Sequence, residues 1–290
     1  MIPNQPSCLI GVDGGGTACR VALTIGGRRF DAALGPANAA TDRLGAIATV
    51  RAGIAQVAAQ AGLDDQTRSL ARVHVALAGI KSSADERDVE RGIEMAHVRV
   101  TEDQVSSLCG ALGAQDGCIA ALGTGSFLAR QRGGRHHFIG GWGIDLGDEA
   151  SGAWLGRGLL AATLRARDGV SQGSPLCKEM MARFGDGAGI MGFVAGANPG
   201  EVAELAPLVA RHALEGDHVA RTLMQAGADY IERGLLALGH ESGGTVALTG
   251  GLRTAYVPWL PMEIQADLRP RMGDALDGAL FLAAQIGARP

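Results

Sequence analysis

Two stretches of the sequence follow the same plan, and this repeat constrains the fold more than any other feature. Residues 8–34 contain an apolar segment, a glycine turn and two further segments around Gly26-Gly27. Residues 117–140 contain an apolar segment, a second glycine turn and two segments around Gly133-Gly134. A two-residue glycine turn joins antiparallel strands, so each stretch predicts three antiparallel strands. We therefore expect two related halves.

Helices and strands alternate after each opening, which predicts an α/β protein. Asp42 is placed to cap a helix that Gly62 would end. No Ser-, Gly- or Pro-rich linker separates the halves, so we expect them to share an interface and a cleft. The remaining strands are expected at 73–78, 98–101, 245–248 and near 263–265, and the helices at 43–61, 84–94, after 103, within 148–238 and at 274–286.

Composition excludes several classes of protein. Lys and Arg number 26 against 30 Asp and Glu, a net charge of −4, and aromatic residues are only 4%. A chain without basic surplus or stacking aromatics is a poor nucleic-acid binder. No basic residue precedes the first apolar stretch and no uncharged run is long enough to cross a bilayer, so neither a signal peptide nor a membrane anchor is expected. The five scattered cysteines match no metal pattern and predict a reduced, cytoplasmic protein.

Three glycine turns follow three apolar strands and form the first candidate site. They are Asp13-Gly14-Gly15-Gly16-Thr17, Gly123-Thr124-Gly125 and Gly250-Gly251. Bare glycines let successive backbone N–H groups point at an anion. Each turn alone is explained by chain reversal, but three at strand ends favour binding of nucleotide phosphates. Asp13 is suited to hold Mg²⁺ or its water shell beside a phosphate.

The common nucleotide-binding motifs do not account for these turns. The chain has only two lysines, Lys81 and Lys178, and neither follows a glycine as a P-loop requires. Residues 187–192 match G-x-G-x-x-G, but they follow an expected helix that ends near Phe184. A dinucleotide site needs a strand before this motif, so the match is not expected to bind a cofactor.

The motifs resemble those of the BadF/BadG/BcrA/BcrD ATPase family, within the actin-like ATPase and sugar-kinase superfamily, with greatest similarity to N-acetylglucosamine and glucosamine kinases. GVDGGGTACR at 11–20 and ALGTGS at 121–126 resemble the two phosphate loops. GGWGIDLGDEASGAWLGR at 140–157 is similar to a GGWG-x-x-x-GDEGS stretch and is the most specific match. LTGGL at 248–252 and GDALDGALFLA at 273–283 resemble the adenosine loop and the closing helix.

The resemblance implies two ribonuclease-H-like domains flanking a cleft, with ATP phosphates between the two Gly-Thr loops and adenosine near Gly250-Gly251. It implies domains at 1–113 with 275–290, on the sugar side, and at 114–274, on the nucleotide side. By motif position, the sugar would contact Asn38, Gly141, Trp142, Gly143 and Asp148. The residues alone leave other interpretations open: Asn38 as a loop cap, Trp142 as a core aromatic and Asp148 as a charge at a helix N-terminus.

The reaction needs a base, because a sugar hydroxyl is weakly acidic. Asp103 lies 20 residues before Gly123, which resembles the position of the family's catalytic aspartate. The family usually has Thr-Asp-Ala there, whereas this chain has Glu102-Asp103-Gln104. Both carboxylates could instead cap the following helix, and Glu102 is the competing base.

We therefore expect a cytoplasmic kinase that uses ATP and Mg²⁺ to phosphorylate glucosamine or N-acetylglucosamine at the 6-hydroxyl. The expected partners are small molecules, with no nucleic acid and no membrane, and a homodimer is expected by analogy with sugar kinases of this group. The main alternative is an ATPase of the same group that activates a partner enzyme. Such activators usually carry Gly-Gly-Gln in the second loop, where this chain has Gly123-Thr124-Gly125.

Overall fold

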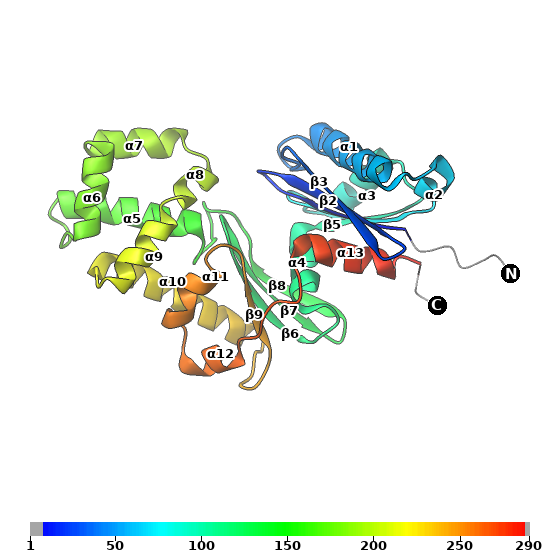
Figure 1. Ribbon diagram of the computed structural model, residues 1–290. Helices are drawn as coiled ribbons and strands as arrows, with labels where there is room; N and C mark the ends of the chain where they lie inside the picture. The colour runs from blue at the N-terminus through cyan, green and yellow to red at the C-terminus, as the bar shows by residue number, and fades with distance from the viewer. Residues whose placement is uncertain (1–7, 288–290) are drawn as a thin grey trace. The chain divides into compact units, whose positions relative to one another are not determined.

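The computed structural model describes residues 8–287 and divides into two compact units (Figure 1). Unit 1 combines the chain up to Gln115 with the segment from Arg271 onward, and unit 2 is Asp116–Pro270. The predicted start of the first strand, Ser7, and the outer ends of the predicted domain bounds lie outside the described residues. Within residues 8–287, no helix combines the length and apolar character that a membrane span needs.

Unit 1 is built on a five-stranded sheet of order β3-β2-β1-β4-β5. Its strands β1, β2 and β3 are antiparallel neighbours, as the glycine turn at 26–27 predicts, whereas β1, β4 and β5 are parallel. The carboxyl ends of the three parallel strands therefore meet at one edge of the sheet. The strands are β1 (Leu9–Gly14), β2 (Cys19–Ile25), β3 (Arg28–Leu34), β4 (Arg72–Leu77) and β5 (His97–Glu102).

Helices cover both faces of this sheet (Figure 1). Helix α1 begins after Asp42, whose side chain accepts the amide of Gly45, and ends at Gly62 with a φ of 67°. Helix α13 packs on β1 and α4, where a side chain at Gly11 would lie 2.7 Å from the Leu280 amide nitrogen. The helices are α1 (Arg43–Ala61), α2 (Asp65–Ser69), α3 (Ser83–Ile93), α4 (Asp103–Leu112) and α13 (Ala275–Gln285).

Unit 2 repeats the strand plan of unit 1. Its sheet has the order β8-β7-β6-β9, with β6, β7 and β8 antiparallel and β9 parallel to β6. A single parallel bridge from Val246 to Leu268 takes the place that β5 holds in unit 1. The predicted internal repeat is thus confirmed. The strands are β6 (Gly117–Leu122), β7 (Ser126–Arg132), β8 (Arg135–Gly140) and β9 (Val246–Thr249).

Most of unit 2 is helical, as the sequence predicts. The G-x-G-x-x-G match at 187–192 forms a helix directly after another helix, which is not the context of a dinucleotide site. The helices are α5 (Gly152–Arg167), α6 (Pro175–Phe184), α7 (Gly187–Gly196), α8 (Pro199–Ala203), α9 (Ala206–Leu214), α10 (His218–Ala237), α11 (Arg253–Tyr256), the 3-10 turn η1 (Val257–Trp259) and α12 (Met262–Asp267).

The predicted strand near 263–265 is wrong, because these residues belong to α12. Pro261 precedes the first helical turn, where its fixed φ of −52° suits a helix start. Ile264 and Asp267 are both buried, three residues apart on one helix face.

The five cysteines are all buried, lie within the described residues and form no disulfide. Burial raises the pKa of Cys8, Cys19, Cys109 and Cys118 to about 11. A thiol with such a pKa stays protonated and unreactive at neutral pH. These side chains therefore act as small core residues, as their scatter in the sequence predicts.

Candidate functional site

The first glycine turn leaves the sheet of unit 1 at the edge where the parallel strands end. Gly14 is aligned with Leu77 of β4, which is aligned with Glu102 of β5. The turn is closed by the Gly15 amide, which donates to the Ala18 carbonyl at 2.9 Å. A side chain at Gly14 would overlap Leu77 Cδ2, so any larger residue would displace the Leu77 side chain. The local packing thus favours glycine here irrespective of any ligand.

Two amides of this turn remain available to an anion. Gly16 and Thr17 are exposed, and within the described part of the chain neither N–H donates a hydrogen bond. A side chain at Gly16 would meet nothing within 4 Å. Adjacent unpaired amides on an open turn can cradle a phosphate. The geometry of unit 1 is therefore compatible with the predicted phosphate loop.

Asp13 lies at the end of β1 and is held by a side chain that the sequence did not single out. Arg20 Nη2 lies 2.6 Å from Asp13 Oδ2, and Arg20 Nη1 lies 2.7 Å from Asp274 Oδ2. Asp274 also caps α13, because its Oδ1 accepts the amides of Leu276 and Asp277. Arg20 therefore ties the first glycine turn to the start of α13.

A divalent cation fits this environment. Both bonds from Arg20 go to Asp13 Oδ2, and within residues 8–287 no hydrogen bond reaches Oδ1. The Asp13 side chain is 20% exposed, so one carboxylate oxygen is open to a hydrated ion. Oxygen donors beside a phosphate loop are what Mg²⁺ prefers.

The two candidate bases are adjacent at the junction of β5 and α4. Asp103 is the first residue of α4, where the Gln104 amide and its own amide stabilise the carboxylate. Burial, and next the charge of Asp13, nevertheless raise the pKa of Asp103 above its usual value. The charge of Glu102 raises the pKa of Asp103 further, and it also raises the pKa of Glu86 on α3, behind burial and the charge of Glu90. Only Asp103 is also affected by the charge of Asp13, at the end of β1.

Asn38 lies at the same edge of the sheet, because it forms a parallel bridge with Ala78 just beyond β4. Its Oδ1 accepts the Ala40 amide at 2.9 Å, so the loop-cap interpretation is correct for the oxygen. That bond leaves the two Nδ2 hydrogens directed elsewhere, and within the described residues they have no partner. Gly79 has a φ of 87°, and a side chain there would overlap Asn38 Oδ1. Asn38 can therefore serve as loop cap and as hydrogen-bond donor together.

The second glycine turn, in unit 2, is joined to the start of α5. The Gly123 amide donates to the Gly125 carbonyl at 3.0 Å, which closes the turn. The Gly123 and Thr124 carbonyls accept the amides of Gly152 and Ala153 in the first turn of α5. The positive end of a helix dipole therefore lies beside this loop, which favours a bound anion.

The third glycine turn contacts the second one through the backbone. Gly250 has a φ of 83°, and a side chain there would overlap the Leu122 carbonyl and lie 2.9 Å from the Gly123 nitrogen. The Leu252 amide also donates to the Leu122 carbonyl at 3.0 Å. Gly251 is exposed and faces open space. Unit 2 thus brings the second and third glycine turns together.

The segment 140–147 is an exposed loop of glycines with an outward-facing aromatic residue. Gly141 and Gly143 have φ values of 73° and 85°, and the Gly141 amide donates to the Ser126 carbonyl. Trp142 is 72% exposed, so its interpretation as a core aromatic is wrong. Leu146 in the same loop is 85% exposed. Trp is enriched at interfaces, so this exposed ring is a candidate for contact with a ligand or partner.

Asp148 follows this loop and is buried beside the second phosphate loop. A side chain at Gly125 would lie 2.7 Å from Asp148 Oδ2. The backbone there is unusual, because Asp148 and Ala150 have φ values of 58° and 67°, a region that residues other than glycine rarely adopt. Ser151 then caps α5 by accepting the Trp154 amide. Asp148 therefore lies just before the helix, and the strain marks this turn as a functional candidate.

Three features of the site were missed in the sequence. Arg20 pairs with Asp274 across 254 residues, and no local pattern reveals such a pair. Gly79 follows an apolar strand and could have been noticed as a fourth glycine at a strand end. Ser151, which caps α5, precedes an apolar helical run and could also have been noticed.

Two ribonuclease-H-like units, each with a glycine loop after its first strand, define the class of actin-like ATPases and related sugar kinases. A ROK family glucokinase from Streptomyces griseus shares the fold, with a TM-score of 0.52 and 21% identity over 96% of this chain and 100% of that chain. The chain belongs to the BadF/BadG/BcrA/BcrD ATPase family, whose model matches residues 10–266. The family resemblance of the motifs is thereby confirmed.

Individual relatives cover almost the whole chain. Glucosamine kinase GspK of Vibrio cholerae is 30% identical over 280 residues, or 95% of each protein. A structure from Chromobacterium violaceum, of a protein named as an N-acetylglucosamine kinase, has a TM-score of 0.86 and 34% identity over 96% of this chain and 99% of that chain.

Proposed function

We propose that this protein is an ATP-dependent kinase that phosphorylates an amino sugar, glucosamine or N-acetylglucosamine, at its 6-hydroxyl. The observation that carries the proposal is the placement of Asp103 in unit 1. This carboxylate has a raised pKa and lies at the same sheet edge as the first phosphate loop and Asn38. Family membership and the full-length similarity to a glucosamine kinase support the substrate class.

We propose that each glycine turn binds part of ATP. The open amides of Gly16 and Thr17 would bind phosphate oxygens in unit 1. In unit 2 the loop Gly123-Thr124-Gly125 would bind phosphate with help from the dipole of α5. The adjoining Gly250-Gly251 turn would contact adenosine. Asp13 would hold Mg²⁺ through its open oxygen or through a bound water, and the ion would offset phosphate charge during transfer.

In the proposed reaction, Asp103 takes the proton of the attacking hydroxyl. The sugar oxygen forms a bond to the γ-phosphorus while the bond between that phosphorus and the β–γ bridging oxygen breaks, so ADP leaves and a sugar phosphate forms. A pKa above the ordinary aspartate value makes the carboxylate a better proton acceptor. Asp13 contributes to that pKa through its charge. Asp103 is proposed as the base in preference to Glu102, because the charge of Asp13 acts on Asp103.

We propose that the sugar is held by the polar groups predicted from the motifs. The Asn38 amide would donate to a sugar oxygen. Gly141, Gly143 and the exposed ring of Trp142 would present one face of an open loop to the sugar, and Asp148 would accept a hydroxyl. Glycines at positive φ allow the backbone of this loop to approach a ligand closely.

The test is an ADP-release assay with Mg-ATP and, in separate reactions, glucosamine, N-acetylglucosamine, glucose or water. Strong stimulation by one amino sugar is expected and would also decide the acetyl preference. ADP release that no sugar stimulates would refute the proposal and favour an ATPase that activates a partner enzyme. Measurable ATP binding without turnover on any sugar would refute the substrate class.

We further propose that the protein is cytoplasmic and forms a homodimer. The absence of disulfides among five buried cysteines supports a reducing compartment. The homodimer is proposed by analogy with sugar kinases of this group. Light scattering of the purified chain would measure its mass directly.

A further inference from the structure

A pocket of about 320 Å³ lies in unit 2 at the edge where β6 and β9 begin. Arg130 and Arg132 of β7 line it together with the loop that connects α10 to β9. The second phosphate loop follows the other end of β6. A six-residue strand spans about 20 Å, so this pocket is separate from the candidate active site.

Neither arginine of this pocket has an acidic partner. Within the part of the chain that the structure describes, no carboxylate lies within ion-pair distance of Arg130 or Arg132. Asp116 and Glu241 also line the pocket but form no ion pair with them. Two guanidinium groups without carboxylate partners in one pocket are suited to bind an anion.

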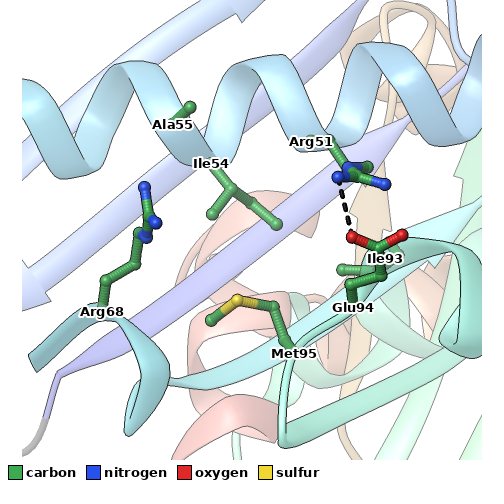
Figure 2. Close-up of a pocket in the computed structure, with 7 residues that line it drawn as sticks. All are labelled: Arg51, Ile54, Ala55, Arg68, Ile93, Glu94 and Met95. Carbon is green, nitrogen blue, oxygen red and sulfur yellow. Dashed lines mark ion pairs between the residues drawn. The ribbon is translucent and has the colours of Figure 1, made fainter. Parts of the chain in front are cut away.

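A pocket in unit 1 provides the contrast (Figure 2). It has a volume of about 230 Å³ and is also lined by two arginines. There Arg51 Nη2 lies 2.8 Å from Glu94 Oε2, and Arg68 Nη2 lies 2.9 Å from Asp65 Oδ1. Because those guanidinium groups already have carboxylate partners, the unit 1 pocket is not expected to bind an anion.

The wall of the unit 2 pocket is built before any ligand arrives. Arg130 Nη1 donates to the Leu238 carbonyl at the end of α10, which fixes the guanidinium and leaves its other nitrogens available. Gly239 has a φ of 76°, and a side chain there would lie 2.7 Å from Arg130 Nη1. The following loop is anchored because His240 Nε2 lies 3.1 Å from the buried Asp267 carboxylate. A fixed wall reduces the entropy lost on binding.

We propose that this pocket binds a phosphorylated sugar. Arg130 and Arg132 would bind the phosphate through charge-assisted hydrogen bonds. The nearby carboxylates of Asp116 and Glu241 would repel a bare anion but would accept hydrogen bonds from sugar hydroxyls. One oxygen of Asp116 already accepts the Gly133 amide at 2.8 Å, which positions the other. The mixed lining thus favours an anion that also carries hydroxyl groups.

The test is isothermal titration of the full chain with glucosamine 6-phosphate, inorganic phosphate and glucosamine. Glucosamine 6-phosphate is a product of the proposed function, on which this inference rests, but its binding is measured without turnover. Failure of the kinase proposal and failure of this one are therefore distinguishable. We expect glucosamine 6-phosphate to bind at a site where inorganic phosphate and the free sugar each bind at least tenfold more weakly.

The decisive variant is Arg132→Gln, because this side chain is exposed and forms no ion pair with any residue of 8–287. It should weaken the site about tenfold or more, the effect of losing a charge-assisted hydrogen bond. Arg51→Gln in the unit 1 pocket is the matched control and should leave binding unchanged. The proposed active site can also bind this product, so the pocket is measured by the binding event that Arg132→Gln weakens. Identical titration curves for the wild type and Arg132→Gln would overturn the proposal, as would equal affinity of that event for inorganic phosphate. The absence of any binding at millimolar probe would overturn it too.

Discussion

Gly250→Ala should destabilise the protein strongly. An alanine at a φ of 83° costs roughly 1–2 kcal/mol for the left-handed backbone. Its side chain would also overlap the Leu122 carbonyl and crowd the Gly123 nitrogen, and overpacking of this kind costs about 1–3 kcal/mol. The sum is about 2–5 kcal/mol, which predicts a fall of about 5–15 °C in the midpoint of thermal unfolding.

The neighbouring glycine provides the matched control. Gly251 has no positive φ, and a side chain there would meet nothing within 4 Å. Gly251→Ala should therefore change the free energy of unfolding by less than about 1 kcal/mol, with either sign. Differential scanning calorimetry of the full-length chain measures both variants. Equal midpoints for the two variants would refute the argument that close backbone contact, and not ligand binding alone, requires glycine at 250.

Four further predictions concern Asp103 and Trp142. Asp103→Asn should lower kcat about 10²–10⁴-fold, the usual contribution of a general base. Glu102→Gln should change kcat little. A larger loss of kcat in Glu102→Gln than in Asp103→Asn would assign the base to Glu102. Because burial raises the pKa of Asp103, the acidic limb of kcat/KM should lie above the ordinary aspartate value, and activity should fall as pH drops through it. Ionisation of Asp103 is harder in the folded state than in the unfolded state, so its contribution to stability is present at low pH and is lost as pH rises through the raised pKa. Asp103→Asn should therefore unfold at a higher temperature than wild type at pH 7, and a lower midpoint would contradict that sign. Trp142→Ala should raise the KM for the sugar about tenfold, which corresponds to a loss of about 1.5 kcal/mol of binding free energy. The midpoint of thermal unfolding should not change, because the ring is 72% exposed. An unchanged KM would exclude the ring from the sugar site.

Local signals in the sequence determine much of the fold. Asp42 and Gly62 mark both ends of α1 because a cap and a left-handed glycine act within one turn. The glycine pairs at 26–27 and 133–134 join the antiparallel strands for the same local reason. The repeat of strand order in the two units then follows from similar local patterns.

Long-range packing explains what the sequence did not reveal. The strand predicted near 263–265 is a helix that follows Pro261 and buries Ile264. The pairing of Arg20 with Asp274 joins residues 254 positions apart, and no periodicity encodes that distance. Trp142 is a large aromatic residue of a type that often lies in a core. Only the fold shows that its ring is exposed, in a loop where the neighbouring glycines have positive φ.

The order in which the chain is made has a consequence for its folding in the cell. Helix α13 packs on β1, where Gly11 leaves room for the Leu280 backbone, yet the ribosome makes all of unit 2 before it reaches α13. At about 5–20 residues per second, the first part of unit 1 waits roughly 10–30 s for this helix. During that interval β1 exposes apolar surface that α13 later covers. Nascent unit 1 should therefore be a target for chaperones that bind exposed apolar surface, while unit 2 is complete in sequence before α13 emerges.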